Sequence, residues 1–264
     1  MYHQPRHSKH ERECYTTNMT GSNIHILDTF DINHVPGLDI AVLVELELFS
    51  QAAVPNIDLG NYKKPLVVGS GNAAATGRIL FADKDAVFGT ESSADAQLTD
   101  IQSIDVVVIV SASGGKHAPI LVETAHKAGK PAILITNTAD SDAGKTLGRQ
   151  SGDKEYVFKK NREPYTYNTS TYMGMILGKT SENPAAIQQF IYDNVDTIDW
   201  PDFSKYQKYY LIVPTEFEGI IRLLNIKFIE LFGRTIARDI ETSEYIKHAT
   251  TVVPAENELF ISLG

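Results

Sequence analysis

The stretch VVVIVSASGGKHAP, residues 106–119, decides the fold of this chain. Its five β-branched apolar residues are typical of a strand that is buried on both faces of a sheet. The run ends at Ser111 and gives way to small residues, Lys116 and Pro119, and proline suits the first turn of a helix. The stretch therefore predicts a buried parallel strand, a small polar loop and a helix start in direct succession.

Similar strand and helix patterns flank this stretch on both sides. Strands are predicted at 65–71, 85–91, 104–110 and 131–138, and helices at 40–53, 72–82, 94–101 and 118–129. Alternation at this spacing predicts a doubly wound α/β sandwich, with a parallel sheet between two helical layers. The loops after the strands then share the carboxyl edge of the sheet, where ligands of such folds bind.

The pattern restarts in a shorter form near the C-terminus. We predict a helix after residue 183 that Pro201 ends, then a strand at 208–214, helices at 216–234 and 242–252, and a final strand at 258–264. The predicted regions are an N-terminal tail and helix (1–60), a first α/β domain (61–195) and a second, incomplete α/β half (196–264).

Composition narrows the classes of partner. The net charge of -9 argues against a nucleic-acid or anionic-membrane surface. Cys14 is the only cysteine, which excludes an intrachain disulfide and fits a cytoplasmic protein. No apolar run reaches the roughly 18 residues that span a bilayer. We interpret His3, His7 and His10 as part of a polar tail, and we expect neither a metal nor a cofactor.

The loop after the 104–110 strand has the composition of an anion site. The hydroxyls of Ser111 and Ser113 and the N–H groups of Gly114, Gly115 and Lys116 would converge at a helix N-terminus, where the helix dipole favours an anion. The Lys116 ammonium would add a charge-assisted bond. The alternative is a plain Ser/Gly-rich turn. The nucleotide-binding pattern G-x-x-x-x-G-K-[ST] is absent from the sequence.

The loop after the first strand admits a different function. GSGNAA, residues 69–74, contains G-x-G-x-x-A between a strand and a helix, and Glu91 ends the next strand, where a ribose-binding acid would stand. This pattern suggests NAD binding, but the motif alone is weak because glycine turns before helices are common. NAD binding therefore remains an alternative.

Taken together, residues 60–180 resemble the SIS (sugar isomerase) domain, a flavodoxin-like fold that binds phosphosugars. The resemblance rests on the apolar strand, the SASGGK loop and the following AGKPAILITN segment. It implies that Ser111 and Ser113 hold the sugar phosphate, with Lys116 in place of the usual threonine. It also places Ser70 and Asn72 of the first loop at the phosphate.

Two further segments extend the resemblance. REPYTYNTST, residues 162–171, is similar to the E-x-x-x-x-T-x-[ST] stretch of the family, which implies that Glu163 and Thr169 line a cleft. Helix 216–234 carries Lys227 within an apolar stripe and Glu230 three residues later. An unpaired buried charge costs several kcal/mol, so mutual neutralisation is the simplest interpretation of this pair.

The second half also resembles the isomerase half of glucosamine-6-phosphate synthase and related double-SIS enzymes. There a K-x-x-E helix precedes an E-x-x-K-H helix, which here match Lys227 and Glu230 and then Glu244, Lys247 and His248, with a gap about two residues longer. The match implies aldose–ketose isomerisation, with Glu230 as the base, His248 opening the sugar ring and Lys227 stabilising an enediolate.

The sequence departs from this pattern in two places. VPTEFEG, residues 213–219, replaces a glycine or serine loop, and Tyr2 stands where a glutaminase would carry a nucleophilic cysteine. We expect no glutamine-dependent amination, and a homodimer or higher homo-oligomer that completes the site. The predicted function is a sugar-phosphate isomerase. The alternatives are a non-catalytic phosphosugar sensor, a phosphosugar lyase or deglycase, and an NAD-binding protein.

Overall fold

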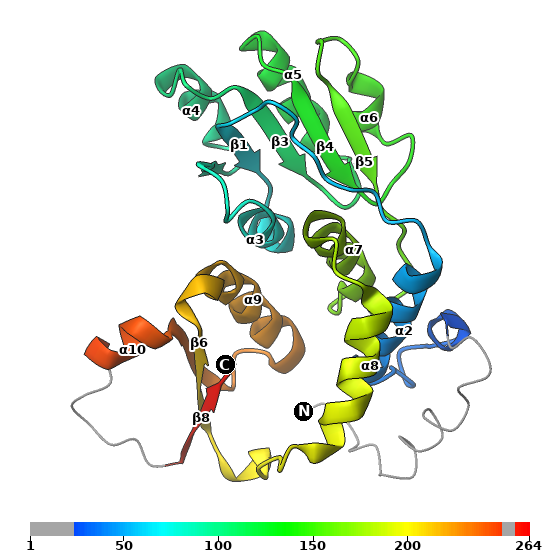
Figure 1. Ribbon diagram of the computed structural model, residues 1–264, viewed down its shortest axis with the longest axis vertical. Coiled ribbons are helices and arrows are strands. Elements are labelled where there is room, and N and C mark those ends of the chain that lie inside the picture. Colours follow the sequence, from blue (N-terminus) through cyan, green and yellow to red (C-terminus); the bar gives the residue numbers. More distant parts are fainter. Residues whose placement is uncertain (1–23, 250–256) are drawn as a thin grey trace.

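A computed structural model of the chain describes residues 24–249 and 257–264. Figure 1 shows two α/β units, a larger one on a five-stranded sheet and a smaller one on a three-stranded sheet. Helix α8 (Pro184–Asn194) and short 3-10 turns join the two units. The predicted tail at 1–23, with Cys14 and its three histidines, lies outside the described residues.

The larger sheet consists of parallel strands in the order β2-β1-β3-β4-β5. The strands are β1 (Pro65–Val68), β2 (Val87–Gly89), β3 (Val106–Val110), β4 (Ala132–Thr136) and β5 (Lys154–Val157). β1, β3 and β4 are buried at every position, which explains their continuous apolar sequences. The strand predicted from the VVVIV run is therefore confirmed as a central strand.

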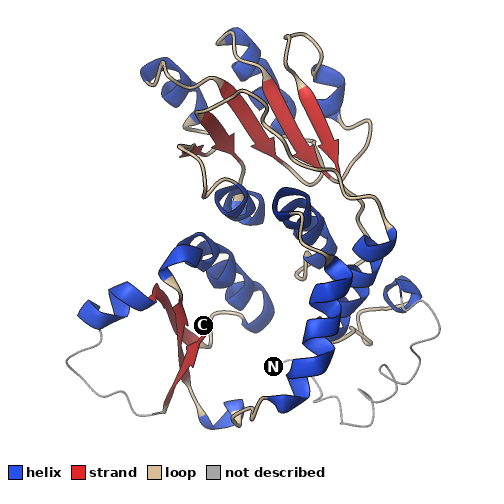
Figure 2. Cartoon of the chain, viewed as in Figure 1, coloured by secondary structure: helices blue, strands red, loops and turns tan. Residues whose placement is uncertain are grey.

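Helices cover both faces of this sheet, as Figure 2 shows. One face packs against α4 (Ala94–Asp100), α5 (Ala118–Lys127) and α6 (Asp142–Thr146). The other packs against α3 (Gly71–Leu80) and α7 (Thr169–Thr180). This arrangement is the predicted three-layer α/β sandwich. In the described part of the chain, no helix combines the length and apolar character that crossing a membrane requires.

The strand order fixes where a ligand crevice opens. The chain passes from β1 to β2 in one direction and from β3 to β4 in the other, so the order switches between β1 and β3. Flavodoxin-like sheets have this order and bind ligands at this switch point, outside the carboxyl ends of the strands. In the dinucleotide-binding order the third strand would lie beyond the second. The topology therefore does not favour NAD binding.

The smaller unit is a parallel sheet of β7 (Ala237–Thr242), β6 (Lys208–Val213) and β8 (Glu258–Ser262), in that order. Apolar side chains of α9 (Ile221–Phe232) pack on one face, against Leu211, Val213 and Ile240. Figure 1 shows α10 (Ser243–Ala249) on the other side of β6 from α9. Its strands and helices lie within the segment 196–264.

Several elements differ from the sequence prediction. The helix predicted from residue 216 begins as a 3-10 turn, η4 (Thr215–Ile220), in which Phe217 has non-helical angles. β7 was not predicted, because three of the six residues in its sequence ARDIET are charged. The helix expected to reach Pro201 ends at Asn194. β5, α6 and α7 were not predicted either, because the polar segment that contains them shows no clear apolar periodicity.

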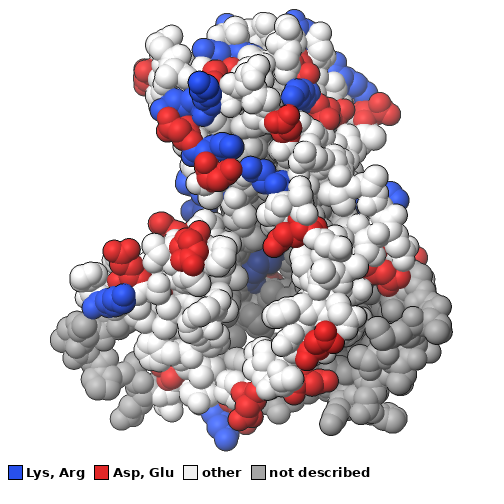
Figure 3. All heavy atoms as spheres, viewed as in Figure 1, with Lys and Arg blue, Asp and Glu red and all other residues white. Residues whose placement is uncertain are grey.

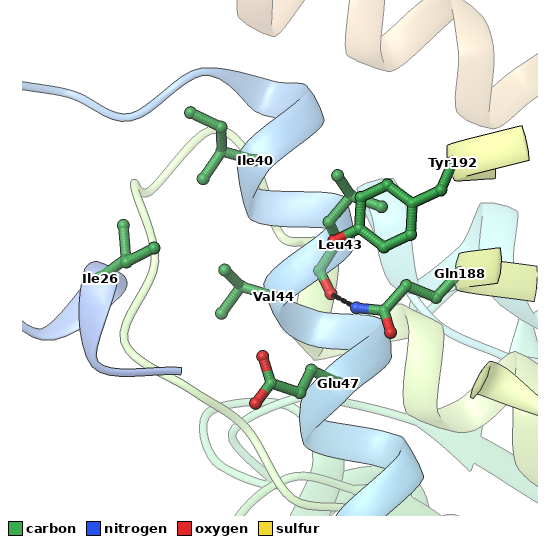
Figure 4. Close-up of a pocket in the computed structure, with 7 residues that line it drawn as sticks. All are labelled: Ile26, Ile40, Leu43, Val44, Glu47, Gln188 and Tyr192. Carbon is green, nitrogen blue, oxygen red and sulfur yellow. Dashed lines mark hydrogen bonds between the residues drawn. The ribbon is translucent and has the colours of Figure 1, made fainter. Parts of the chain in front are cut away.

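The N-terminal helix α2 (Leu38–Gln51) belongs to the packed structure. It lies beside α8, and the Gln188 side chain donates a hydrogen bond of 2.8 Å to the Leu43 carbonyl, as Figure 4 shows. The cavity at this contact has a volume of about 20 Å³ and is lined mainly by apolar side chains. A space of that size holds about one water molecule, so this cavity is a packing feature.

Candidate functional site

The β3–α5 loop is folded tightly at the carboxyl edge of the larger sheet. Gly114 is buried with φ of 57°, a left-handed conformation that favours glycine. A Cβ atom there would overlap the Ser141 side chain, and the Gly114 carbonyl accepts a 2.8 Å hydrogen bond from the Ala143 N–H. Gly114 therefore fixes the loop against the start of α6.

The polar groups of this loop differ in their hydrogen bonding and exposure. The Ser113 hydroxyl accepts a 3.3 Å hydrogen bond from the Gly115 N–H. Lys116 is exposed and has φ of 51°, which is unusual for a residue with a side chain. The loop thus carries the predicted hydroxyls and ammonium at the switch point, beside the N-terminus of the ten-residue helix α5.

The β1–α3 loop forms the other side of this crevice. A Cβ on Gly69 would lie 3.1 Å from the Val110 carbonyl oxygen, so the ends of β1 and β3 approach closely. Ser70 is the exposed residue before α3, and it borders a cleft of about 350 Å³ together with Glu91 and His117. Asn72 lies in the first turn of α3 but points toward the smaller unit.

Asn72, Lys227 and Glu230 form a hydrogen-bonded cluster between the two units. The Asn72 Nδ2 group donates to both carboxylate oxygens of Glu230, at 3.0 and 3.2 Å. Lys227 Nζ lies 2.6 Å from Glu230 Oε2, with side-chain exposures of 19% for Lys227 and 26% for Glu230. The neutralisation expected from the sequence is therefore present. The same contact brings the Glu230 carboxylate to the carboxyl end of β1.

Lys227 also holds the segment that precedes α7. Its ammonium donates to the carbonyl oxygens of Thr166 at 2.9 Å and Tyr167 at 3.0 Å. An ammonium has three protons, and together with Glu230 these partners use all of them. Lys227 therefore fixes the position of Glu230 relative to the larger unit, in a partly buried setting where such contacts are strong.

Glu163 caps the N-terminus of α7. Its carboxylate accepts hydrogen bonds from the Thr169 N–H, from the Ser170 N–H at 3.0 Å and from the Thr171 hydroxyl at 2.8 Å. A carboxylate at this end of a helix is stabilised by the free N–H groups and the helix dipole. Glu163 is thus a structural cap, and it supports the segment that Lys227 contacts. Thr169 begins the helix, and its buried hydroxyl has no hydrogen-bond partner in the described part of the chain.

Tyr172 is a neighbour of the cluster that the sequence did not reveal. Burial, followed by the charges of Glu230 and Glu163, raises the pKa of the Tyr172 phenol to about 12. The phenol therefore stays protonated at neutral pH. The only signal in the sequence is its place three residues after Thr169.

His248 lies apart from the cluster within one chain. It is exposed on α10, which packs on β7 and β6, whereas Lys227 and Glu230 lie on α9, on the other side of that sheet (Figure 1). Glu244 and Lys247 are exposed on the same short helix. The structure thus brings two of the three predicted catalytic residues together and leaves His248 without contact to them.

Glu45 is a buried carboxyl that the sequence analysis did not single out. It lies on α2, it is 0% exposed, and neither carboxyl oxygen has a hydrogen-bond partner among the described residues. Burial and the charge of Glu163 raise its pKa to about 8, against a smaller opposing effect of the Asn161 amide. The signal for this position is its place between Ala41 and Phe49 on the apolar face of α2.

Charges of both signs surround the place where the two units meet, as Figure 3 shows. A cleft of about 750 Å³ opens between them, with Arg78 on the larger unit and Arg222 and Glu218 on the smaller one. Within residues 24–249 and 257–264, no three His, Cys, Asp or Glu side chains converge in a way that could hold a metal ion.

The five-stranded order, the crevice at its switch point and the smaller parallel unit define an α/β protein with the fold of the SIS domain. The fold predicted from the sequence resemblance is therefore confirmed. No protein-family model matches this sequence, and no curated protein does.

Two solved structures illustrate the likeness. Glucosamine-6-phosphate deaminase from Thermotoga maritima superposes with a TM-score of 0.60 at 15% identity, over 86% of this chain and 76% of that chain. The C-terminal domain of glucosamine-fructose-6-phosphate aminotransferase from Francisella tularensis gives 0.55 at 12% identity, over 88% of this chain and 77% of that chain. At these identities the likeness establishes the fold.

Proposed function

We propose that this chain binds a sugar phosphate at the carboxyl ends of β1 and β3 and interconverts its aldose and ketose forms. The observation that carries the proposal is the position of the Glu230 carboxylate. Helix α9 of the smaller unit brings it to the first turn of α3, where Asn72 and Lys227 hold it. A carboxylate fixed beside a phosphosugar crevice is suited to move a proton between two carbon atoms.

The β3–α5 loop supplies the phosphate site in this proposal. Ser111 and Ser113 offer hydroxyls, Gly114 and Gly115 allow a close approach to the backbone, and Lys116 offers a positive charge. Ser70 borders the adjoining cleft from the β1 side. Asn72, expected at the phosphate, is bonded to Glu230 instead, so we assign it to positioning the base.

The reaction moves one proton between two carbon atoms and one proton between two oxygen atoms. The carboxylate of Glu230 removes the proton from C2 of the open-chain aldose, and the electron pair moves toward the carbonyl to form an enediolate. The proton on O2 then passes to O1 through solvent water, and Glu230 returns a proton to C1 as the C2 carbonyl forms, which gives the ketose without net uptake or release of protons. Lys227 lies 2.6 Å from this carboxylate, and its positive charge favours the charged intermediate.

Replacing Glu230 by glutamine tests this role. We expect Glu230→Gln to lower turnover of a responsive sugar phosphate by about 10² to 10⁴-fold, the usual contribution of a general base. The shift in Tm on adding that sugar phosphate should remain, because the phosphate loop is intact. Asp95→Gln, at an exposed acid on α4, is the control. Unchanged turnover in Glu230→Gln would contradict the assignment.

Binding without turnover is the second candidate function. Two observations favour it: all three protons of Lys227 have partners, and His248 lies on the opposite side of the smaller sheet from Glu230. A sensor would show a Tm shift with one sugar phosphate and no conversion of it after prolonged incubation. An isomerase would show both the Tm shift and an aldose–ketose mixture.

A further inference from the structure

The proposed reaction lacks one group within a single chain. Sugar phosphates exist mainly as rings, and ring opening needs an acid to protonate the ring oxygen. His248 was expected to supply it, but it lies apart from Glu230. We propose that His117, oriented by Glu91, is the acid that opens the ring. This inference rests on the proposed isomerase function.

His117 occupies the right place for this task. It follows Lys116 of the phosphate loop directly, and it borders the 350 Å³ cleft with Ser70 and Glu91. In a hexose 6-phosphate, only two carbon atoms separate the ring oxygen from the oxygen that carries phosphorus. A phosphate held by the loop therefore brings the ring oxygen close to the next residue. On the other side, Ser70 is two positions from Asn72, which holds the base.

Glu91 and His117 form the pair that an acid catalyst needs. The Glu91 carboxylate lies 3.5 Å from Nδ1 of His117, and the two side chains are 32% and 60% exposed. Because Nδ1 lies beside Glu91, Nε2 is the ring nitrogen left for a ligand in the cleft. The pair is accessible to substrate and solvent, and histidine exchanges protons readily near neutral pH.

The turn that carries Glu91 is fixed by its own hydrogen bonds. The Thr90 N–H donates to the Ser93 hydroxyl at 2.9 Å, and the hydroxyls of Thr90 and Ser92 lie 3.1 Å apart. The turn that carries Glu91 is thus held before a ligand arrives. Thr90 and Ser92 also border the cleft, where their hydroxyls suit the hydroxyl groups of a sugar.

The step balances with solvent water as the only co-reactant. The C1–O5 bond breaks, its electron pair goes to O5, and O5 takes the proton from Nε2 of His117. The O1–H electron pair forms the C1 carbonyl, and the O1 proton passes to a water molecule. His117 then regains a proton from solvent, and the open-chain aldose is available to Glu230.

The test compares a substrate that forms a ring with one that does not. Glucose 6-phosphate closes a ring, whereas erythrose 4-phosphate carries phosphate on the oxygen that would close it and stays open. For each substrate, kcat/KM for ketose formation would be measured on the full chain and on His117→Gln, Glu91→Gln and His248→Gln. His34→Gln is the matched control, because His34 forms an exposed pair with Asp31 at 3.1 Å, outside the cleft.

We expect His117→Gln to lower kcat/KM for glucose 6-phosphate about tenfold or more and to leave that for erythrose 4-phosphate within about twofold. Glu91→Gln should have a smaller effect in the same direction, and His248→Gln none. Equal losses on both substrates, or no loss on either, would overturn the role of His117. Absence of turnover of both substrates by the unaltered chain would instead refute the isomerase function, and this inference with it.

Discussion

The buried carboxyl of Glu45 makes the stability of the folded chain depend on pH. Its pKa is about 8 in the folded chain against 4.5 for an ordinary glutamate. Between these values the folded chain holds a proton that the unfolded chain has lost. Stability therefore falls as pH rises through this window, by about 1.4 kcal/mol per pH unit from this group alone.

The Glu45→Gln variant removes the titrating group and keeps its size. From pH 5.5 to pH 7.5 the unaltered chain should lose about 2.5 kcal/mol of unfolding free energy that the variant keeps. The variant should therefore gain stability relative to the unaltered chain as pH rises, with little further change above about pH 9, where both states of Glu45 are ionised.

Urea unfolding at pH 5.5, 6.5 and 7.5 measures this difference. Glu123→Gln is the control, because Glu123 is exposed on α5 and should leave the pH profile unchanged. If Glu45→Gln and the unaltered chain lose stability in parallel from pH 5.5 to 7.5, the carboxyl is not protonated in the folded chain. The inference from burial and from the charge of Glu163 would then be wrong.

Three further predictions follow from named contacts. Asp153→Asn should cost about 3 kcal/mol in urea unfolding at pH 7, since its buried carboxylate accepts from Ala132 N–H at 2.9 Å and pairs with His126 at 3.0 Å. Although burial opposes ionisation, these bonds lower the pKa of Asp153, so the stability that its carboxylate adds should be lost as pH falls below about 4. An Asp153→Asn variant as stable as the unaltered chain at pH 7 would contradict the predicted loss. Gly114→Ala should lower Tm by several degrees through its positive φ and its overlap with Ser141, and an unchanged Tm would show that the loop adjusts freely. Ser113→Ala should weaken sugar-phosphate binding in calorimetry about tenfold, and equal affinity would remove Ser113 from the phosphate site.

Most strands and helices of the larger unit could be predicted from the sequence, because the patterns that mark them are local. The run at 106–110 is apolar on both faces, and the glycines and serines after it mark the end of the strand. The order β2-β1-β3 was not readable, since it depends on pairing between distant segments. β7 was not predicted because it is an edge strand of a small sheet and three of its six residues are charged.

The candidate site was predictable in part for the same reason. Lys227 and Glu230 are three residues apart on one helix, so their pairing follows from helix geometry. Their contacts with Asn72 and with the carbonyls before α7 depend on how the two units pack, which spacing alone does not show. His248 was predicted to be catalytic from its resemblance to a motif. In the structure β7 lies between α9 and α10 along the chain, and α10 carries His248 on the opposite side of the sheet from α9 (Figure 1).

Exchange of the C2 hydrogen tests the central claim most directly. Proton transfer by Glu230 through an enediolate should introduce deuterium from D₂O at C2 of a bound aldose phosphate, which proton NMR detects as loss of the C2 signal. The account predicts exchange with the unaltered chain and its loss in Glu230→Gln, while the Tm shift with the same sugar phosphate persists in both. Exchange that continues undiminished in Glu230→Gln would contradict it.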